Sequence, residues 1–468
     1  MRLLYLAVMP VTTSRPAPRQ PTDEAAPNTA NSARDVVVVV VANAVVIAGL
    51  WLRHGGMDAV DSAGGALTAV GQLSGLLGAY AVLLQLLLMA RVPVLERHVG
   101  FDRLAGWHRW NGFAAVTLIV VHAVTITLGY AATGHLTLFA QILDFIRHYP
   151  DVLMAIVATI LLIGIAITSI RAARARLRRE TWYFVHLYAY LAVALGFAHQ
   201  LAVGSDFVDD PVARAWWVGL YVVVGSVILF WRVGSPLAFN ARHRLHVANV
   251  VKEGPGVFSI YIEGRHLDQV RAKSGQFFLW RFLTRDGWWQ AHPFSLSAPP
   301  DGRTLRITVK ELGDFTRKVS ELRLGTPVFA EGPYGTFTAR RRTRRRVLLI
   351  AGGIGITPLR ALIESLNAAP GEITLLYRVQ RPDDFVFRDE IDRLVINRGI
   401  VVHPLAGVDI GDDETDRLGV HALRQLVPDV VDRDVYVCGP PALVDAVHRR
   451  LRHLGVPRQQ IHIERFAY

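Results

Sequence analysis

The chain has 468 residues, more than one ordinary domain, and 51% of them are hydrophobic. Its mean hydropathy of +0.30 is high for a soluble protein, and long uncharged runs are concentrated in the first half. The formal charge of +12 falls largely on arginines beside those runs, which the positive-inside rule explains better than nucleic-acid binding, and the single cysteine, Cys438, excludes an internal disulfide or a cysteine-ligated cluster within one chain.

Residues 1–34 precede the apolar runs. They are rich in Pro, Thr, Ala and Asn and lack hydrophobic periodicity. A segment of this composition cannot bury enough apolar surface to offset the entropy of ordering. We therefore expect a disordered N-terminal tail.

Residues 35–240 contain six windows that are long and apolar enough to be membrane spans. These windows are 36–52, 67–90, 107–130, 152–170, 182–203 and 216–233. Arginines are concentrated after the second, fourth and sixth windows, and cytoplasmic loops carry such an excess. The pattern predicts a six-helix transmembrane bundle, surrounded by lipid of the cell (plasma) membrane, with both termini cytoplasmic.

Four histidines lie inside the third and fifth windows, where ionisable side chains are costly and usually functional. His108 and His122 are 14 residues apart, and His186 and His199 are 13 apart. At about 1.5 Å per residue, the two members of each pair are roughly 20 Å apart along their helix. Two helices that each offer an inner and an outer imidazole can hold two stacked bis-histidine haems.

The helical phase of these histidines is less regular. The 14-residue step leaves His122 about 40° from the face of His108. The 13-residue step places His199 about 140° from His186, so we expect a local tightening of the helix at Gly196. Each histidine alone has a simpler explanation, a buried ring hydrogen-bonded to a neighbouring helix. A shared zinc ion does not fit, because imidazoles in different leaflets cannot reach one ion.

Residues 241–340 change to short β segments broken by Gly, Pro and Asp, which predicts an antiparallel β-barrel. Two motifs stand out, H-P-F-S at 292–295 and G-D-F-T at 313–316. The second places a glycine turn before a helix whose N–H groups can face a phosphate. Turn chemistry explains either motif taken alone.

Residues 341–468 predict an α/β domain with a parallel sheet, because strands at 347–350, 373–378, 400–404 and 434–438 alternate with helical stretches. A-G-G-I-G-I-T-P follows the first strand at 351–358. Its glycines let the backbone approach a pyrophosphate, and Pro358 suits a first helical turn. C-G-P-P at 438–441 ends another strand, where nucleotides bind such sheets, although Cys438 is also explained as a small core residue.

Taken in order, these motifs resemble the ferric reductase and NADPH oxidase family, in which a membrane b-type cytochrome is fused to a ferredoxin-reductase-like flavoprotein. The set consists of the four histidines, HPFS, GDFT, G-P-Y-G at 332–335, GGIGITP, CGPP and an aromatic residue near the terminus. The likeness runs from about Val36 to Tyr468. It implies FAD, two b-type haems, and NADPH or NADH as electron donor, with the haem ligands His108, His122, His186 and His199.

The resemblance also implies the residues around the flavin and the nucleotide. The flavin would be lined by His292, Pro293, Phe294 and Ser295. The FAD phosphates would be approached by Lys310, Gly313, Asp314, Phe315 and Thr316, and the flavin cleft would be closed by Gly332 and Tyr334. The nicotinamide nucleotide would be held by Gly352, Gly353, Gly355, Thr357, Pro358 and Gly439. The residues nearest the reacting rings would be Ser295, Cys438 and Phe466, although two residues follow Phe466. Arg378 and Arg381 would favour NADPH over NADH.

The function implied is a transmembrane oxidoreductase that carries electrons from cytoplasmic NADPH through FAD and two haems to an external acceptor. We expect oxygen, giving superoxide, because the short external loops contain no obvious iron-ligand cluster. Ferric-chelate reduction and electron delivery to a protein partner are the alternatives. A transporter is not favoured, since the windows show neither paired broken helices nor intramembrane carboxylates.

Overall fold

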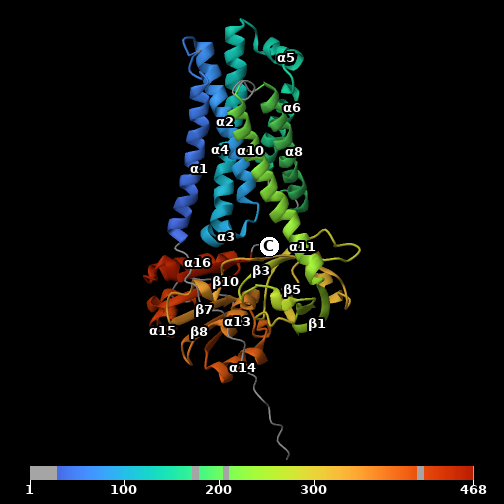
Figure 1. Ribbon diagram of the computed structural model, residues 1–468. Coiled ribbons are helices and arrows are strands. Elements are labelled where there is room, and N and C mark those ends of the chain that lie inside the picture. Colours follow the sequence, from blue (N-terminus) through green and yellow to red (C-terminus); the bar gives the residue numbers. More distant parts are fainter. Residues whose placement is uncertain are drawn as a thin grey trace, which may run out of the picture.

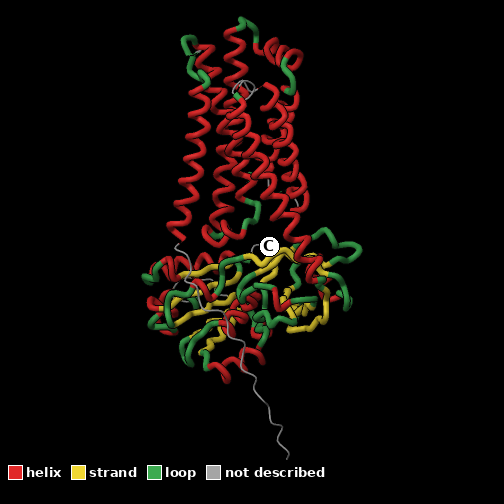
Figure 2. The backbone as a smooth tube through the Cα atoms, viewed as in Figure 1, coloured by secondary structure: helices red, strands yellow, loops and turns green. Residues whose placement is uncertain are grey.

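The computed structural model describes residues 29–58, 60–170, 176, 179–203, 210–407 and 416–466. A bundle of long helices stands on a globular half that contains the strands (Figures 1 and 2). Residues 1–28, most of the expected tail, lie outside the described residues. The first helix begins at Thr29, so residues 29–34 belong to that helix and the expected tail boundary is corrected.

Six helices of the described chain are long and apolar enough to cross a membrane, in agreement with the six windows. They are α1 (Thr29–Arg53), α2 (Ala63–Leu88), α4 (Phe101–Thr133), α6 (Val152–Ser169), α8 (Arg179–Val203) and α10 (Pro211–Ile228). Two short helices, α3 (Pro93–Val99) and α5 (Leu138–His148), lie between them. Large apolar side chains such as Val39, Ile160 and Leu229 are mostly exposed, as expected for a bundle whose outer surface contacts lipid.

The last span is longer than the sequence indicated. α10 continues through a π-helical segment (Leu229–Gly234) into α11 (Ser235–His243), which enters the globular half (Figure 1). There the Asn240 side chain donates to the carbonyl of Ala330 and accepts from the N–H of Ala330, both at 2.8 Å. The membrane bundle is thus joined to the globular half by a helix rather than by a loose linker.

The first globular domain contains two three-stranded antiparallel sheets in the orders β1-β2-β5 and β4-β3-β6. The strands are β1 (His246–Gly254), β2 (Val257–Glu263), β3 (Phe277–Phe282), β4 (His292–Ser295), β5 (Thr304–Lys310) and β6 (Val328–Tyr334). Isolated bridges at His246–Pro327 and Leu296–Ile307 connect the sheets around one shared apolar core. The expected barrel is therefore confirmed only in part. β4 is short and contains Pro293, which has no N–H to extend the ladder.

The second globular domain is built on a five-stranded parallel sheet in the order β11-β10-β7-β8-β9, as expected for this half of the sequence. Its strands are β7 (Arg346–Gly352), β8 (Ile373–Val379), β9 (Val401–Ala406), β10 (Arg433–Gly439) and β11 (Ile461–Arg465). Its main helices are α13 (Ile356–Ser365), α14 (Arg388–Arg398), α15 (Val420–Leu426) and α16 (Pro441–His453). The edge strand β11 was not expected from the sequence, because its alternating polar residues give a weak strand signal.

Helices cover both faces of this sheet. Alternate residues of β7 belong to two different apolar clusters: Leu349 packs with α13 and α14, and Leu348 packs with α15 and α16. The chain order reverses between β7 and β10, and the carboxyl ends of these two strands carry GGIGITP and CGPP. Open α/β sheets bind ligands at such a reversal point.

Candidate functional site

Two of the four membrane histidines are oriented by backbone carbonyls of the neighbouring helix α2. The Nδ1 of His122 donates to the carbonyl of Gly71 at 2.8 Å, and the Nδ1 of His108 donates to the carbonyl of Gln85 at 3.1 Å. A carbonyl can only accept, so Nδ1 carries the proton and Nε2 keeps its lone pair. A hydrogen bond of this kind sets the tautomer and orientation of a metal-ligating histidine.

Glycines on α2 make this close approach of α4 feasible. A Cβ on Gly75 would lie 2.5 Å from the Nδ1 of His122, and a Cβ on Gly71 would lie 2.6 Å from Ile126. Gly71, Gly75 and Gly78 are spaced by four and three residues, so they share one helix face. This glycine face was not predicted from the sequence, although the small-residue pattern within the second window was a signal of it.

The inner pair, His108 and His186, is brought together by α4 and α8. The two ring centroids are 6.1 Å apart with an interplanar angle of 62°, and Trp182 stacks on His186 at 5.0 Å. Metal–imidazole bonds are about 2.0–2.1 Å long, so two rings that share one ion have centroids roughly 6 Å apart. The spacing of the inner pair therefore fits two axial ligands of one haem iron.

The outer pair, His122 and His199, is also brought together. His199 lies within range of a direct electrostatic interaction with His122. The Nδ1 of His199 is buried and has no hydrogen-bond partner among the described residues, which is costly for a polar atom unless the ring acquires a ligand. α8 stays α-helical through Gly196, so the tightening expected there is not visible as a change of helix type.

Gln200 fixes the end of α8 next to His199. Its side-chain oxygen accepts from the indole of Trp217 at 2.8 Å and from the hydroxyl of Tyr221 at 3.0 Å, both on α10. α8 is thereby held to α10 at the depth of the outer pair. Gln200 was not among the residues predicted from the sequence.

On the globular half, strand register gathers the residues expected around the flavin. Phe277 of β3 pairs with Ser295 of HPFS on one side and with Tyr334 of GPYG on the other. The ring of Phe315, from the one-turn helix α12 (Asp314–Arg317), stacks on His292 at 3.7 Å. HPFS, GDFT and GPYG, which are separate in the sequence, therefore meet around the β4-β3-β6 sheet.

The GDFT turn is organised by its own threonine. The Thr316 hydroxyl accepts from the N–H groups of Leu312 and Gly313 at 2.8 and 2.9 Å. Asp314 is exposed and pairs with Arg317 at 3.4 Å.

Tyr334 also faces the membrane half. The guanidinium of Arg91, in the α2–α3 connection, lies 4.4 Å from the Tyr334 ring centroid and 3.9 Å from that of Phe101. Burial raises the pKa of Tyr334 to about 12, so its hydroxyl remains protonated. The loop expected to close the flavin cleft is thus in contact with the end of the histidine-bearing bundle that lies nearest the globular half (Figure 1).

Each nucleotide-loop glycine has a different role. Gly353 has φ +53° and open space where a Cβ would be, so its backbone surface is accessible. Gly355 is pressed against β10, because a Cβ there would overlap the carbonyl oxygen of Cys438. A Cβ on Gly352 would overlap Leu443 of α16. Gly353 is therefore the glycine of this loop best placed to contact a ligand, while the other two permit close packing.

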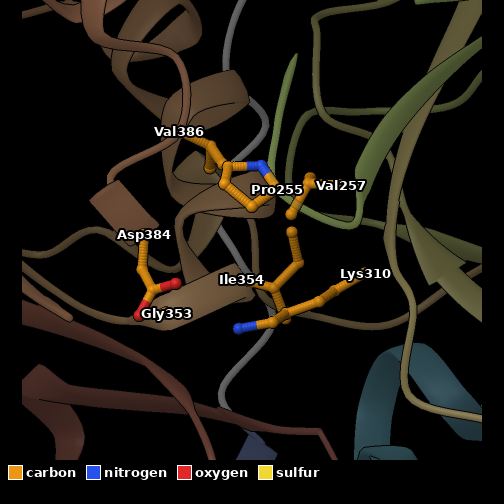
Figure 3. A pocket seen from close by; sticks show the side chains of 7 residues that line it. All are labelled: Pro255, Val257, Lys310, Gly353, Ile354, Asp384 and Val386. Atoms are coloured by element: carbon orange, nitrogen blue, oxygen red, sulfur yellow. The ribbon is translucent and has the colours of Figure 1, made fainter. Parts of the chain in front are cut away.

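A pocket lies between the two globular domains (Figure 3). It is lined by Pro255, Val257, Lys310, Gly353, Ile354, Asp384 and Val386. Lys310 comes from the first domain and reaches across toward Gly353 and Asp384 of the second (Figure 3). Arg381 and Lys310 help to hold the pKa of Asp384 below its usual value. The pocket thus combines a cation expected near FAD phosphates with a glycine expected near the nucleotide.

The remaining nucleotide-loop and terminal residues surround Gly439. Thr357 and Pro358 are buried at the start of α13, and the Thr357 hydroxyl donates to the carbonyl of Ile354 at 3.0 Å. The N–H of Phe466 donates to the carbonyl of Gly439 at 3.2 Å. The expected nucleotide loop, the CGPP turn and the terminal aromatic are therefore neighbours.

Cys438 itself is placed differently from the expectation of a residue at the reacting rings. Its side chain is fully buried in the apolar core beneath α13, and burial raises the pKa of its thiol. A thiol in this environment is neither exposed nor ionised. The structure thus favours the simpler interpretation, a small core residue, and leaves only the main chain of Cys438 near the loop.

The two arginines expected to recognise a 2′-phosphate differ in placement. Arg378 is 8% exposed and pairs with Asp416 at 2.8 Å, while Arg450 of α16 binds the other oxygen of Asp416 at 2.7 Å. Arg378 is therefore a buried structural residue and is withdrawn as a phosphate contact. Arg381 is exposed and pairs with Asp384 at 3.2 Å, at the edge of the pocket.

Three protein-family models match successive parts of the chain. The model described as "Ferric reductase like transmembrane component" matches residues 74–197. This range includes His108, His122 and His186 but not His199. The FAD-binding domain model matches residues 246–338, and the oxidoreductase NAD-binding domain model matches residues 349–449. The chain has the ferric reductase and NADPH oxidase type of architecture, a ferric-reductase-like transmembrane component followed by FAD-binding and oxidoreductase NAD-binding domains.

Individual proteins match parts of this chain. The flavohemoproteins of Pseudomonas putida and Deinococcus radiodurans are each 32% identical to it, over 42% and 38% of the chain. The chain spans about half the length of these relatives, 52% and 47%. The flavohem-like FAD/NAD-binding domain of nitric oxide dioxygenase from Vibrio cholerae matches with a TM-score of 0.40 and 24% identity, over 48% of this chain and 98% of that one.

The two reductase domains are joined by an ion cluster that was not predicted from the sequence. Arg306 of β5 binds Glu390 of α14 at 2.7 Å, and Arg360 of α13 binds the other oxygen of Glu390 at 2.6 Å. Arg306 also donates to the carbonyl of Ser297 at 2.7 Å, two residues after Ser295. We call Arg306, Arg360 and Glu390 the interdomain ion cluster. No sequence motif marks it, because its members are ordinary charged residues in three separate elements.

Proposed function

We propose that this chain moves electrons from NAD(P)H to an acceptor on the opposite side of the membrane, using one FAD and two b-type haems. The observation that carries the proposal is the inner pair. Its ring centroids are 6.1 Å apart, and the Nδ1 of His108 is engaged by the Gln85 carbonyl, which leaves Nε2 for a metal. The outer pair would hold the second haem.

The cofactors supply the redox chemistry: the flavin converts a two-electron hydride into single electrons, and each haem iron carries one. The chain supplies position and charge. The β4-β3-β6 sheet holds HPFS and Tyr334 on one side of the flavin site, and Lys310 offers a cation to phosphate oxygens. Gly353 leaves its backbone open to the nucleotide.

The interdomain ion cluster would set the distance between the flavin ring and the nicotinamide ring. The cluster links Ser297 to α13, which begins directly after the nucleotide loop. Ser297 lies two residues after Ser295, which is proposed to lie near the flavin atom that accepts hydride. Hydride transfer requires reacting atoms about 3–3.5 Å apart, so small shifts between the domains cost rate. Arg306, Arg360 and Glu390 are therefore proposed as positioning residues.

The proposed orientation places both termini and the reductase half in the cytoplasm, in the cell membrane. Its support is the arginine excess after the second, fourth and sixth spans, together with the need of the nucleotide-binding domain for cytoplasmic NAD(P)H. With His108 and His186 nearest the reductase half, the inner pair then lies on the cytoplasmic side.

Oxygen, reduced to superoxide by outer-sphere transfer, is the acceptor we propose. If each haem is held by one histidine of α4 and one of α8, oxygen would be reduced without binding to the iron. Ferric-chelate reduction is the second candidate, and delivery to a protein partner is the third. NADPH is proposed as the donor. Arg381 is the one remaining residue of the two that supports it, because Arg378 is held in an ion pair with Asp416.

The test uses purified protein, loaded with haem and FAD, in detergent or nanodiscs. We expect a low-spin b-type haem spectrum and NADPH oxidation coupled to a superoxide signal that superoxide dismutase removes. His122→Ala and His199→Ala should abolish the external reduction while NADPH still reduces the flavin. A colourless preparation, or full external reduction in either variant, would refute the proposal; a higher rate with ferric chelate would reassign the acceptor.

A further inference from the structure

α16 has one apolar face and one basic face. Leu443, Val444, Val447 and Leu451 pack against the sheet in one core cluster. At 3.6 residues per turn, Arg449 and Arg452 lie on the opposite side of the helix. Both are exposed, as is Arg458 in the turn that follows. We call Arg449, Arg452 and Arg458 the α16 basic face.

The position of α16 directs this face toward the membrane plane. Figure 1 shows α16 between the parallel sheet and the lower ends of the spanning helices, reaching sideways past α1. Because the apolar face of α16 lies on the sheet, its basic face points away from the sheet. In the view of Figure 1 one end of α16 extends beyond the lower end of α1, so lipid headgroups would lie above that end.

The charges of this face are not neutralised within the described part of the chain. Arg452 donates to the carbonyl of Val456 at 2.6 Å, an uncharged acceptor, and no carboxylate there pairs with Arg449 or Arg458. The nearby Asp445 is paired with Arg465 at 2.8 Å. By contrast, Arg345 and Arg346, at the start of β7, bind Glu372 and Asp429.

The pKa of His448 is lowered first by burial and then by the positive charges around it. Arg465 and Arg452 lower the pKa of the His448 imidazole, Asp445 opposes them, and Arg458 adds a smaller lowering effect. A surface of uncompensated arginines near a bilayer attracts the anionic lipids of the cytoplasmic leaflet, and salt screens the attraction.

We propose that the α16 basic face binds the anionic headgroups of the adjacent leaflet and holds the NAD-binding domain against the membrane surface. The bound species is the lipid surface itself, and phosphate diester headgroups are the matching acceptors for guanidinium groups. The proposal depends on the chain spanning a bilayer and does not depend on the haems, the acceptor or the donor.

The experiment places a fluorophore near this face in the full chain. Gln459→Cys introduces an exposed thiol next to Arg458, and native Cys438 is buried and does not compete for the label. The labelled protein is reconstituted into nanodiscs of phosphatidylcholine, or of phosphatidylcholine mixed with phosphatidylglycerol, each with a trace of lipid that carries a nitroxide on its headgroup. Quenching by the nitroxide reports the approach of α16 to the headgroups.

We expect several-fold stronger quenching in the phosphatidylglycerol discs, falling toward the phosphatidylcholine level as salt is added. Replacing Arg449, Arg452 and Arg458 together by Gln should remove the difference between the two lipids. The matched control is Arg393→Gln on α14, which lies at the end of the molecule farthest from the spans (Figure 1) and should change nothing. A second label at Asn397→Cys on α14 should not be quenched.

Equal quenching in both lipids, or quenching unchanged by the triple substitution, would overturn the proposal. Reduction of FAD by NADPH in detergent, measured on the same variants, shows whether the triple variant is folded. If it is not, the single variant Arg449→Gln is used, which should lose part of the lipid-dependent quenching. Since quenching needs no electron transfer, failure here is distinguishable from failure of the proposed function.

Discussion

Arg306 of the first reductase domain and Glu390 of the second make a two-point ion pair, with Nη1–Oε1 at 2.7 Å and Nη2–Oε2 at 3.0 Å. The Arg306 side chain is only 5% exposed and that of Glu390 18%. Burial alone would raise the pKa of the Glu390 carboxyl, but the hydrogen bonds and charges of Arg306 and Arg360 outweigh it and hold the pKa below its usual value. The pair therefore joins the domains as charged groups.

Glu390→Gln should uncouple the two reductase domains. The substitution leaves Arg306 and Arg360 without their shared counter-charge, and breaking one side of a buried ion pair costs about 3–5 kcal/mol. Stopped-flow measurement should show the rate of FAD reduction by NADPH falling by roughly 100-fold if the rings are displaced by about 1 Å. The matched control is Glu364→Gln, since Glu364 binds Arg360 alone and from within the same helix. Equal effects of both substitutions would show that the cluster does not position the domains.

The same pair predicts an acid-side loss of stability. A carboxyl with a folded-state pKa below its unfolded value stabilises the protein above the unfolded pKa, and this contribution disappears as pH falls through the folded pKa. The unfolding temperature of the reductase half, followed by release of FAD, should exceed that of Glu390→Gln at neutral pH. The two should converge as the pH is lowered through the acid range. If the difference between the two unfolding temperatures grew as the pH was lowered, the pKa of Glu390 would not be lowered in the folded protein.

Gly75→Ala should remove the outer haem. The added methyl group would lie 2.5 Å from the Nδ1 of His122 and displace the ring from the Gly71 carbonyl. The haem absorbance per FAD should fall by about half, while flavin reduction by NADPH is retained. Gly164→Ala on α6 is the control, because a Cβ there meets nothing within 4 Å. A full haem complement in Gly75→Ala would argue against His122 as a ligand.

Gly355→Ala should weaken nucleotide binding more than flavin binding. Its methyl group would overlap the carbonyl oxygen of Cys438, so α13 must move away from β10, at a cost of about 1–3 kcal/mol. The KM for NADPH should rise by roughly 10-fold, since 1.4 kcal/mol corresponds to one decade. FAD content, measured by absorbance, should be unchanged. A variant with normal KM would show that the Gly355–Cys438 contact does not shape the nucleotide loop.

Cys438 should be chemically inert in the folded protein. Its thiol is fully buried and its pKa is raised by burial, and alkylation requires an accessible thiolate. Iodoacetamide should label Cys438 only as fast as the protein unfolds. NADPH should slow the labelling only to the extent that it slows unfolding. Rapid labelling that NADPH blocks would instead place the thiol at the nucleotide site.

Six membrane spans, a parallel nucleotide-binding sheet and the two histidine pairs were predictable from the sequence alone. Each of these depends on a local pattern. The six spans follow from long uncharged segments, the sheet from strands that alternate with helices, and the histidine pairs from polar residues at matched depth, as with His108 and His186. Such signals survive because burial in lipid or in a sheet constrains every residue of the element.

The tertiary structure decided what those patterns left open. It showed which carbonyls orient His108 and His122, that Arg378 forms an ion pair with Asp416, and that the Cys438 side chain lies in the core. It also brought Arg306, Arg360 and Glu390 together from three elements, and left the arginines of α16 exposed on the side away from its apolar face. These features depend on contacts between residues far apart in the chain, and ordinary Arg, Glu and Gly residues carry no local signal of the partner that they will meet.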